Sequence, residues 1–157
     1  MVHDPTPWGV ELAKVAERLQ AKTKQTRWTD RTDVLVERDF IVGAYVVRKL
    51  LCYHPASQEL RNRRIPIRRF DPAARLPIAP GDIGASYDLA LSRRDTLTPA
   101  ELCHQIVNNT VFAFYCGETA DLFDGVYVAS DCEEENVILV IASDFIALCD
   151  DIVTEIL

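Results

Sequence analysis

The C-terminal part of this sequence has no positive side chains. From Asp95 to Leu157 there is no lysine or arginine, while acidic residues continue along the whole stretch. Positive charge gathers before it, because residues 61–94 hold eight arginines and three aspartates, a net charge of +5 in a chain of formal net charge -7. Such polarity means either that the two parts pair within the fold or that the molecule presents faces of opposite sign to partners. The sequence leaves both explanations open.

Long apolar runs are also missing. The longest, Phe40–Val47, has eight residues, whereas a membrane-spanning helix needs about 20. Asp4, Pro5 and Pro7 interrupt the start of the chain before an apolar region can form, so we expect no signal peptide. These features predict a cytoplasmic protein that makes no contact with a membrane.

The cysteines lack the paired spacing, such as C-x-x-C, of a zinc site. They are odd in number and widely separated: Cys52, Cys103, Cys116, Cys132 and Cys149. This usage predicts reduced thiols that pack as small hydrophobic side chains. A nucleophilic Cys103 is not supported, because His104 is its neighbour on a predicted helix and points in another direction. The acidic run Asp131–Glu135 lacks the spaced ligands and the turn glycine of a calcium loop. We expect neither a metal nor a cofactor.

Residues 29–55 predict the helix around which the chain is built. Its apolar face has the three- and four-residue spacing of a helix and consists of Val36, Phe40, Gly43, Val47 and Leu50. Further apolar residues widen this face, which indicates a buried helix. Thr29 or Thr32 can cap its start. A glycine in mid-helix costs about 1 kcal/mol relative to alanine, so we expect another element to pack closely against Gly43.

Other helices and strands are predicted on both sides of this helix. Thr6–Lys22 has the narrow apolar stripe of a surface helix, and Thr98-Pro99-Ala100-Glu101 is a capping box that starts another. Three strands follow, at residues 110–116, 125–130 and 137–142, and a last helix begins at Ser143.

The middle of the chain predicts little regular structure. Ile65, Ile67 and Phe70 suggest a short strand, which Pro66 would confine to a sheet edge because proline cannot donate to the ladder. Most of the arginine- and proline-rich segment 61–95 reads as irregular. The predicted fold is a single α+β domain over residues 1–157: N-terminal helices including one long buried helix, then a helix, a three-stranded antiparallel meander and a C-terminal helix.

Two segments carry a resemblance to known sequences. Glu37-Arg38-Asp39-Phe40 through Arg48-Lys49-Leu50, and later Leu102-Cys103-His104-Gln105-Ile106 running into a strand, resemble short uncharacterised bacterial proteins of unknown function. The resemblance covers the central helix and the C-terminal half. It implies a bacterial, cytosolic protein and carries no information about chemistry.

A second resemblance concerns Arg48 and His54, six positions apart at the end of the central helix. This spacing resembles the motif of HEPN-domain ribonucleases, in which the arginine binds the scissile phosphate and the histidine assists proton transfer. Residues six apart on a regular helix point about 120° away from each other, and the predicted strands do not belong to an all-helical fold. The alternative is that Arg48 is a solvated cation at the helix end and His54 a C-terminal cap.

Five arginines crowd the segment after the central helix: Arg61, Arg63, Arg64, Arg68 and Arg69. Arginine binds phosphate bidentately, so this cluster can hold a phosphorylated ligand or nucleic acid, or it can pair with the acidic C-terminal part. The acidic net charge favours the second use. We therefore expect a non-catalytic interaction protein that binds a protein partner or itself through opposed acidic and basic faces. The alternative is an RNA-binding or RNA-cleaving protein that uses Arg48, His54 and the arginine cluster.

Overall fold

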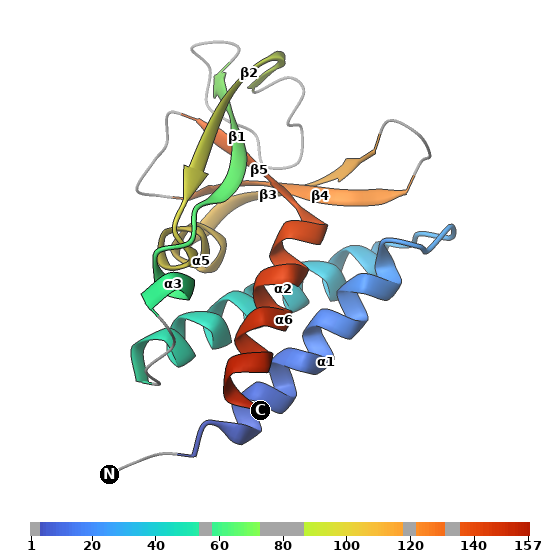
Figure 1. Ribbon diagram of the computed structural model, residues 1–157. Helices are drawn as coiled ribbons and strands as arrows, with labels where there is room; N and C mark the ends of the chain where they lie inside the picture. Colours follow the sequence, from blue (N-terminus) through green and yellow to red (C-terminus); the bar gives the residue numbers. More distant parts are fainter. Residues whose placement is uncertain (1–3, 54–57, 73–86, 118–121, 131–135) are drawn as a thin grey trace.

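A computed structural model describes residues 4–53, 58–72, 87–117, 122–130 and 136–157 (Figure 1). The helices are α1 (Thr6–Lys22), α2 (Asp30–Tyr53), α3 (Gln58–Arg61), α5 (Pro99–Val107) and α6 (Ala142–Ile156). The strands are β1 (Ile65–Pro72), β2 (Tyr87–Leu97), β3 (Asn109–Cys116), β4 (Phe123–Ser130) and β5 (Val137–Ile141). The predicted mixed helix and sheet composition is confirmed.

The long central helix forms as predicted. In α2 the side chains of Val36, Phe40 and Val47 are completely buried, and Thr29 caps the start by accepting a hydrogen bond from the Thr32 backbone N–H. The expectation for Gly43 is also confirmed. A Cβ at Gly43 would lie 3.0 Å from a methyl group of Val15 on α1 and 3.3 Å from the Phe145 ring on α6. The glycine therefore lets α1 and α6 approach α2 closely.

The strands form one antiparallel sheet with the order β2-β1-β5-β4-β3. The predicted meander is present as β3, β4 and β5, but the expectation of a three-stranded sheet is wrong, because the β1-β2 hairpin extends it to five strands. The hairpin comes from the segment 61–95 that we expected to be mainly irregular. Tyr87, Leu89 and Leu91 alternate as in a strand, but apolar residues in 83–90 also fit a helical turn, so the sequence left the two open. The structure has a strand here, β2, which is largely exposed.

The edge position expected from Pro66 is also wrong, because β1 pairs with β2 on one side and with β5 on the other. Pairing to β5 covers only Arg68, Arg69 and Phe70, however. Pro66 lies before that ladder begins and pairs with Thr96 of β2 alone. The missing N–H of proline is therefore tolerated at a place where β1 has a single neighbour.

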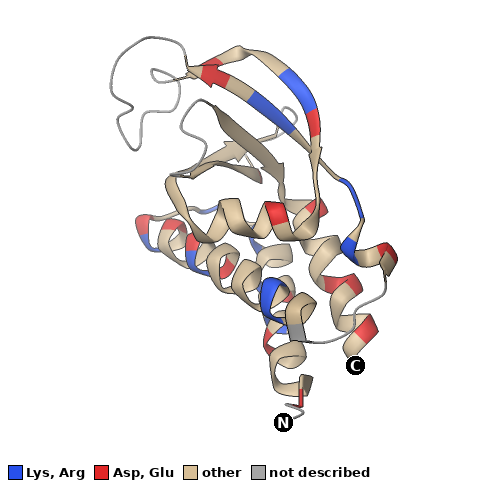
Figure 2. Cartoon of the chain, turned by 90° about the vertical axis from the view of Figure 1, so that its left-hand side faces the viewer, with Lys and Arg blue, Asp and Glu red and all other residues tan. Residues whose placement is uncertain are grey.

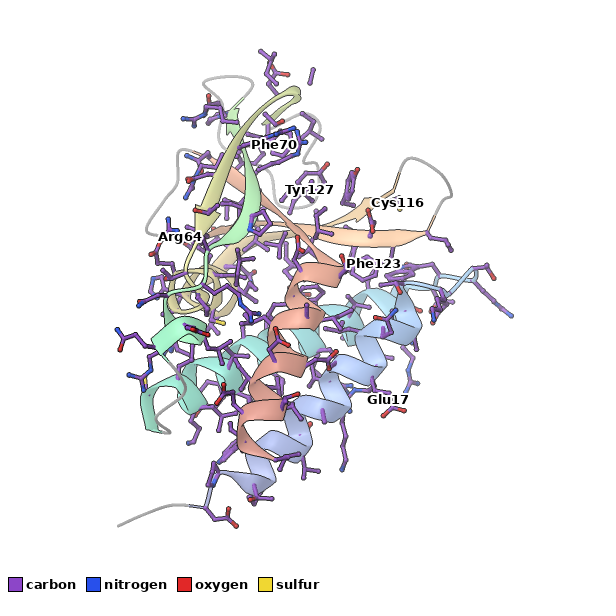
Figure 3. The ribbon with its side chains drawn as sticks, in the orientation of Figure 1. Glu17, Arg64, Phe70, Cys116, Phe123 and Tyr127 are labelled. Atoms are coloured by element: carbon purple, nitrogen blue, oxygen red, sulfur yellow. The ribbon has the colours of Figure 1, made fainter. Side chains whose placement is uncertain are left out.

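Each face of the sheet carries its own apolar cluster. On the proximal face, defined as the face toward α2, α5 and α6, side chains such as Ile67, Val126 and Ile138 join the main core with the helices. On the distal face, which is the opposite one, Phe70, Tyr127 and other side chains form a second cluster. Figure 3 shows Phe123 directed toward the helices, while Phe70 and Tyr127 lie on the other side of the sheet. In Figure 1 the β1-β2 hairpin projects away from the helical layer.

Candidate functional site

The β1-β2 hairpin sorts its arginines onto the two faces of the sheet. Residues opposite each other in an antiparallel pair lie on the same face, and successive residues alternate between faces. Arg68 pairs with Arg94, and Arg69 pairs with Arg93. Because Phe70 lies in the distal cluster, Arg68 and Arg94 share the distal face, and Arg69 and Arg93 share the proximal face.

The two proximal arginines have carboxylate partners within the hairpin. Arg69 Nε donates to Asp95 at 2.6 Å, and Arg93 Nη2 donates to Asp71 at 2.8 Å. The hydrogen bond from Arg69 holds the pKa of the Asp95 carboxyl below its ordinary value. Arginines and aspartates thus lie close together along this hairpin (Figure 2). The two arginine–aspartate pairs therefore neutralise the charge on the proximal face of the hairpin.

The two distal arginines have different surroundings from those of Arg69 and Arg93. Arg68 Nη1 donates to the hydroxyl of Ser92 at 3.0 Å, and neither Arg68 nor Arg94 has a carboxylate within 4 Å in the described part of the chain. Arg64 lies near them, since its Nε donates to the Thr96 hydroxyl at 2.9 Å, and it reaches Glu101 only at 3.9 Å. Two adjacent guanidinium groups without a counter-charge repel each other, so an anion from outside would stabilise this arrangement.

A pocket of about 500 Å³ lies beside these arginines. It is lined by Pro66, Ile67, Arg68, Arg94, Asp95, Thr96, Leu139, Ile141 and Asp144. The pocket opens where β1 and β5 separate, because the β1-β5 ladder does not extend past Arg68 and β5 gives way to α6 at Ala142. Its volume is in the range of sites that bind small molecules or peptide side chains.

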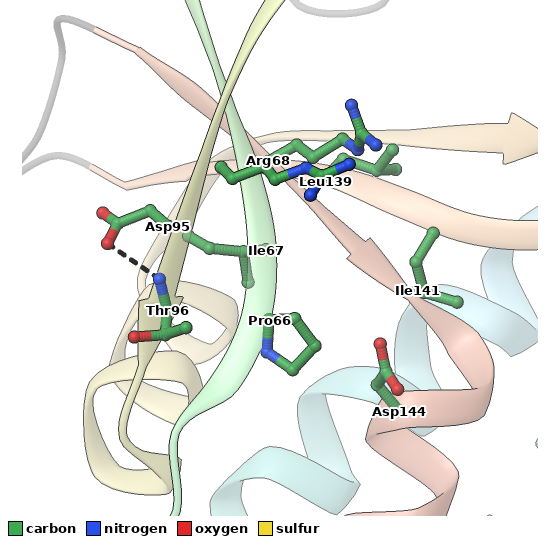
Figure 4. Close-up of a pocket in the computed structure, with 9 residues that line it drawn as sticks. Pro66, Ile67, Arg68, Asp95, Thr96, Leu139, Ile141 and Asp144 are labelled. Atoms are coloured by element: carbon green, nitrogen blue, oxygen red, sulfur yellow. Dashed lines mark hydrogen bonds between the residues drawn. The ribbon is translucent and has the colours of Figure 1, made fainter.

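The pocket is lined by charges of both signs. Arg68 and Asp144 lie at opposite ends of it in Figure 4, with Pro66 and Ile141 between them. The Asp95 carboxylate is directed away from Arg68, since it is bonded to Arg69 and to the Thr96 backbone N–H. Burial raises the pKa of the Asp144 carboxyl, and no described residue forms a hydrogen bond or ion pair with it.

Beside the pocket, apolar side chains cover the distal face of the sheet. Leu139 pairs with Arg68 on one side and with Tyr127 on the other, so these three side chains form one row across the sheet. The Tyr127 ring contacts the rings of Phe70 and Tyr115 edge-on, with centroids 5.8 and 5.9 Å away. The arginines therefore border an aromatic and aliphatic surface.

The other predicted arginines lie outside this pocket. Arg63 forms an ion pair with Asp151 of α6 at 2.6 Å, so part of the arginine cluster pairs with the acidic C-terminal part of the same chain. Arg61 is exposed at the end of α3. Among the five clustered arginines, Arg68 alone lines the pocket, because the cluster spans α3, the turn after it and both faces of β1.

Of the two residues that resemble the HEPN nuclease motif, the structure describes Arg48. Arg48 is half-buried on α2 and lines a small hollow of about 190 Å³ with Tyr45, Lys49 and Cys52. His54 lies outside the described residues, as does the acidic run Asp131–Glu135.

The described cysteines are divided between core and surface. Cys103 and Cys149 are completely buried, whereas Cys52 and Cys116 are exposed. Burial raises the pKa of Cys103 to about 12, so its thiolate is scarce at neutral pH. Its neighbour His104 is exposed and contacts Asn108 through Nδ1. This geometry opposes nucleophilic catalysis at Cys103 and fits a packing role. Within the described ranges, no three His, Cys, Asp or Glu side chains gather as metal ligands would.

Sequence reasoning missed Arg94 and Asp144 as site residues. Arg94 was counted in the charged segment, but its place beside Arg68 depends on the register of the hairpin. Asp144 comes to the pocket from α6, far along the chain, and no local pattern marks it. The signal available in the sequence was the excess of arginine over acidic residues between positions 61 and 94.

No helix in the described parts of the chain has the length and apolar character required to cross a membrane. Comparison of the chain with protein-family models, with curated proteins and with solved structures finds no match.

Proposed function

We propose that this chain is a non-catalytic interaction protein that binds an acidic segment of a protein partner at the distal arginine site. The site is defined as Arg68, Arg94, Thr96 and the adjoining pocket wall. The observation that carries the proposal is the contrast across the hairpin: the proximal arginines have carboxylate partners, whereas Arg68 and Arg94 have none among the described residues. A partner carboxylate would supply the missing charge.

The surroundings of the arginines favour a peptide ligand. The pocket has apolar walls formed by Pro66, Leu139 and Ile141. Such walls can pack against the apolar side chains of a peptide. Binding sites for single-stranded nucleic acid combine a positively charged groove with aromatic stacking platforms. Here the rings of Tyr127 and Phe70 contact each other edge-on within the distal cluster, and no aromatic residue lines the pocket in the described part of the chain.

A second copy of the chain can also supply the acidic segment. Helix α6 has no basic residue in its last turn, and Asp151 and Glu155 are exposed along it. Asp151 already pairs with Arg63. Self-association through these groups would place oppositely charged surfaces together, as the charge polarity of the sequence suggests.

The proposal is tested with three fluorescent probes measured by anisotropy at low salt. The probes are a ten-residue peptide of alternating glutamate and serine, the same peptide with glutamine for glutamate, and a single-stranded RNA. Wild-type protein is compared with the Arg68→Ala/Arg94→Ala variant and with Arg93→Ala. Arg93 is the matched control, because it is adjacent to Arg94 in sequence, similarly exposed, and paired with Asp71 on the other face.

We expect the glutamate peptide to bind and the glutamine peptide to bind much more weakly. The double variant should lose about tenfold in affinity or more, since charge-assisted hydrogen bonds are worth more than 1 kcal/mol each, and Arg93→Ala should change little. Tighter binding of RNA through the same arginines would favour the RNA-binding alternative. Equal losses in all variants, or no binding, would refute the proposal. Sedimentation velocity of the unliganded protein tests whether a second copy is the partner.

A further inference from the structure

The pocket holds opposite charges that do not neutralise each other. Arg68 lies at one end of the pocket and Asp144 at the other (Figure 4). Arg94, which also lines the pocket, is opposite Arg68 in the hairpin register. Within the described residues no ion pair joins Asp144 to either arginine. Two arginines alone would select any anion. A carboxylate in the same pocket repels a purely anionic ligand at its end, so the two ends together favour a ligand that carries both signs of charge.

The Asp144 carboxylate has no hydrogen-bond or ion-pair partner among the residues that the structure describes. The residue is half-buried in the first turn of α6. An acidic residue there interacts favourably with the helix dipole, but that interaction does not require the side chain to line a pocket. Partial burial without a hydrogen-bond partner disfavours the ionised carboxylate. A cationic group entering the pocket would compensate this cost.

The wall between the charged ends is apolar. Pro66, Leu139 and Ile141 occupy it. In an extended peptide, alternate side chains point to the same side, and residues i and i+4 are roughly 13 Å apart. An acidic residue, an apolar residue and a basic residue at alternate positions would therefore place three side chains on the one side of the peptide that faces the pocket.

We infer that the partner segment of the proposed function has an acidic-x-apolar-x-basic pattern, and that Asp144 selects the basic residue. The acidic side chain contacts Arg68 and Arg94, and the apolar side chain lies on the wall formed by Leu139 and Ile141. Asp144 is thus a specificity-determining residue of the site. This inference rests on the proposed function, because it concerns the same pocket and the same class of ligand.

The test uses two labelled peptides that differ at one position. The first contains Glu-Ser-Leu-Ser-Lys within a glycine-serine scaffold, and the second has glutamine in place of the lysine. Affinities are measured for wild-type protein, for Asp144→Asn and for Asp150→Asn. Asp150 is the matched control because it lies on the same helix, is exposed and does not line the pocket. Thermal melts verify that each variant is folded.

For wild-type protein we expect the lysine peptide to bind about fivefold more tightly than the glutamine peptide, as for a partly exposed ion pair. This preference should disappear in Asp144→Asn and persist in Asp150→Asn. A charge exchange provides a second readout: the Asp144→Lys variant should prefer a peptide with glutamate in place of the lysine.

The outcomes separate this inference from the proposed function. If both peptides bind through Arg68 and Arg94 with equal affinity in wild-type protein, the role of Asp144 is refuted while the proposed function stands. If the lysine preference persists in Asp144→Asn, another residue makes the selection and the inference is wrong. If neither peptide binds, the proposed function fails and the inference fails with it.

Discussion

Loss of the Arg18 side chain should destabilise the fold measurably, because it removes the main partner of a buried carboxylate. Asp39 on α2 is 1% exposed, whereas the Arg18 side chain on α1 is 39% exposed. Arg18 Nε donates to both carboxylate oxygens of Asp39, at 3.1 and 3.3 Å, and Nη2 donates at 2.9 Å. In the Arg18→Met variant, which keeps much of the apolar stem, these hydrogen bonds are lost.

The expected loss of unfolding free energy depends on the burial of Asp39 and on the partial exposure of Arg18. Breaking a fully buried ion pair costs about 3–5 kcal/mol. Solvent reaches Arg18, and the exposed Arg38 keeps a 3.4 Å contact to Asp39, so we expect a smaller loss of about 2 kcal/mol in the free energy of unfolding. This corresponds to a fall of roughly 4–8 °C in the melting temperature for a chain of this size.

Urea denaturation followed by circular dichroism measures this loss. The double variant Arg18→Met/Asp39→Leu is the informative comparison, because it removes both charges and leaves an apolar pair between α1 and α2. We expect it to recover much of the stability, since the penalty comes from the uncompensated buried charge rather than from lost attraction. A loss below about 0.5 kcal/mol for Arg18→Met would show that the pair behaves as an ordinary surface contact and would refute the reasoning.

Two further predictions concern the core. Gly43→Leu should lower the free energy of unfolding by about 1–3 kcal/mol, because even a Cβ at this position would lie 3.3 Å from the Phe145 ring. A urea titration that shows unchanged stability would contradict the close helix packing. The thiols of Cys103 and Cys149 should resist alkylation in the folded protein at pH 8, because both are buried and their pKa values are raised, whereas the exposed Cys52 should react. Mass spectrometry after timed iodoacetamide treatment locates the modified residues, and rapid labelling of Cys103 would be the contrary result.

The helices could be predicted because their signals are local. The apolar spacing of α2 and the capping box of α5 both lie within a few turns of chain, and Thr98 accepts from the Glu101 backbone N–H as the motif requires. The three C-terminal strands could also be predicted, because they are rich in β-branched and aromatic residues. Local chemistry therefore accounts for most of the elements.

The hairpin and the pocket depend on contacts between distant residues. β2 is exposed over most of its length and its apolar residues also fit a helical turn, so the pairing with β1 decides that it is a strand. The distal arginine site arises from three such contacts: the register that sets Arg94 beside Arg68, the short β1-β5 ladder, and the start of α6 that carries Asp144. Local patterns in the sequence therefore identify the arginines but do not show which residues lie beside them in the fold.

The measurement that tests the account most directly compares Arg94→Ala with Arg93→Ala in binding the glutamate peptide. The two residues are adjacent in β2, both are exposed, and the hairpin places them on opposite faces. The account predicts a clear loss of affinity for Arg94→Ala and almost none for Arg93→Ala. Equal effects of the two substitutions would mean that the peptide responds to the net charge of the hairpin, and the distal arginine site would not exist as a binding site.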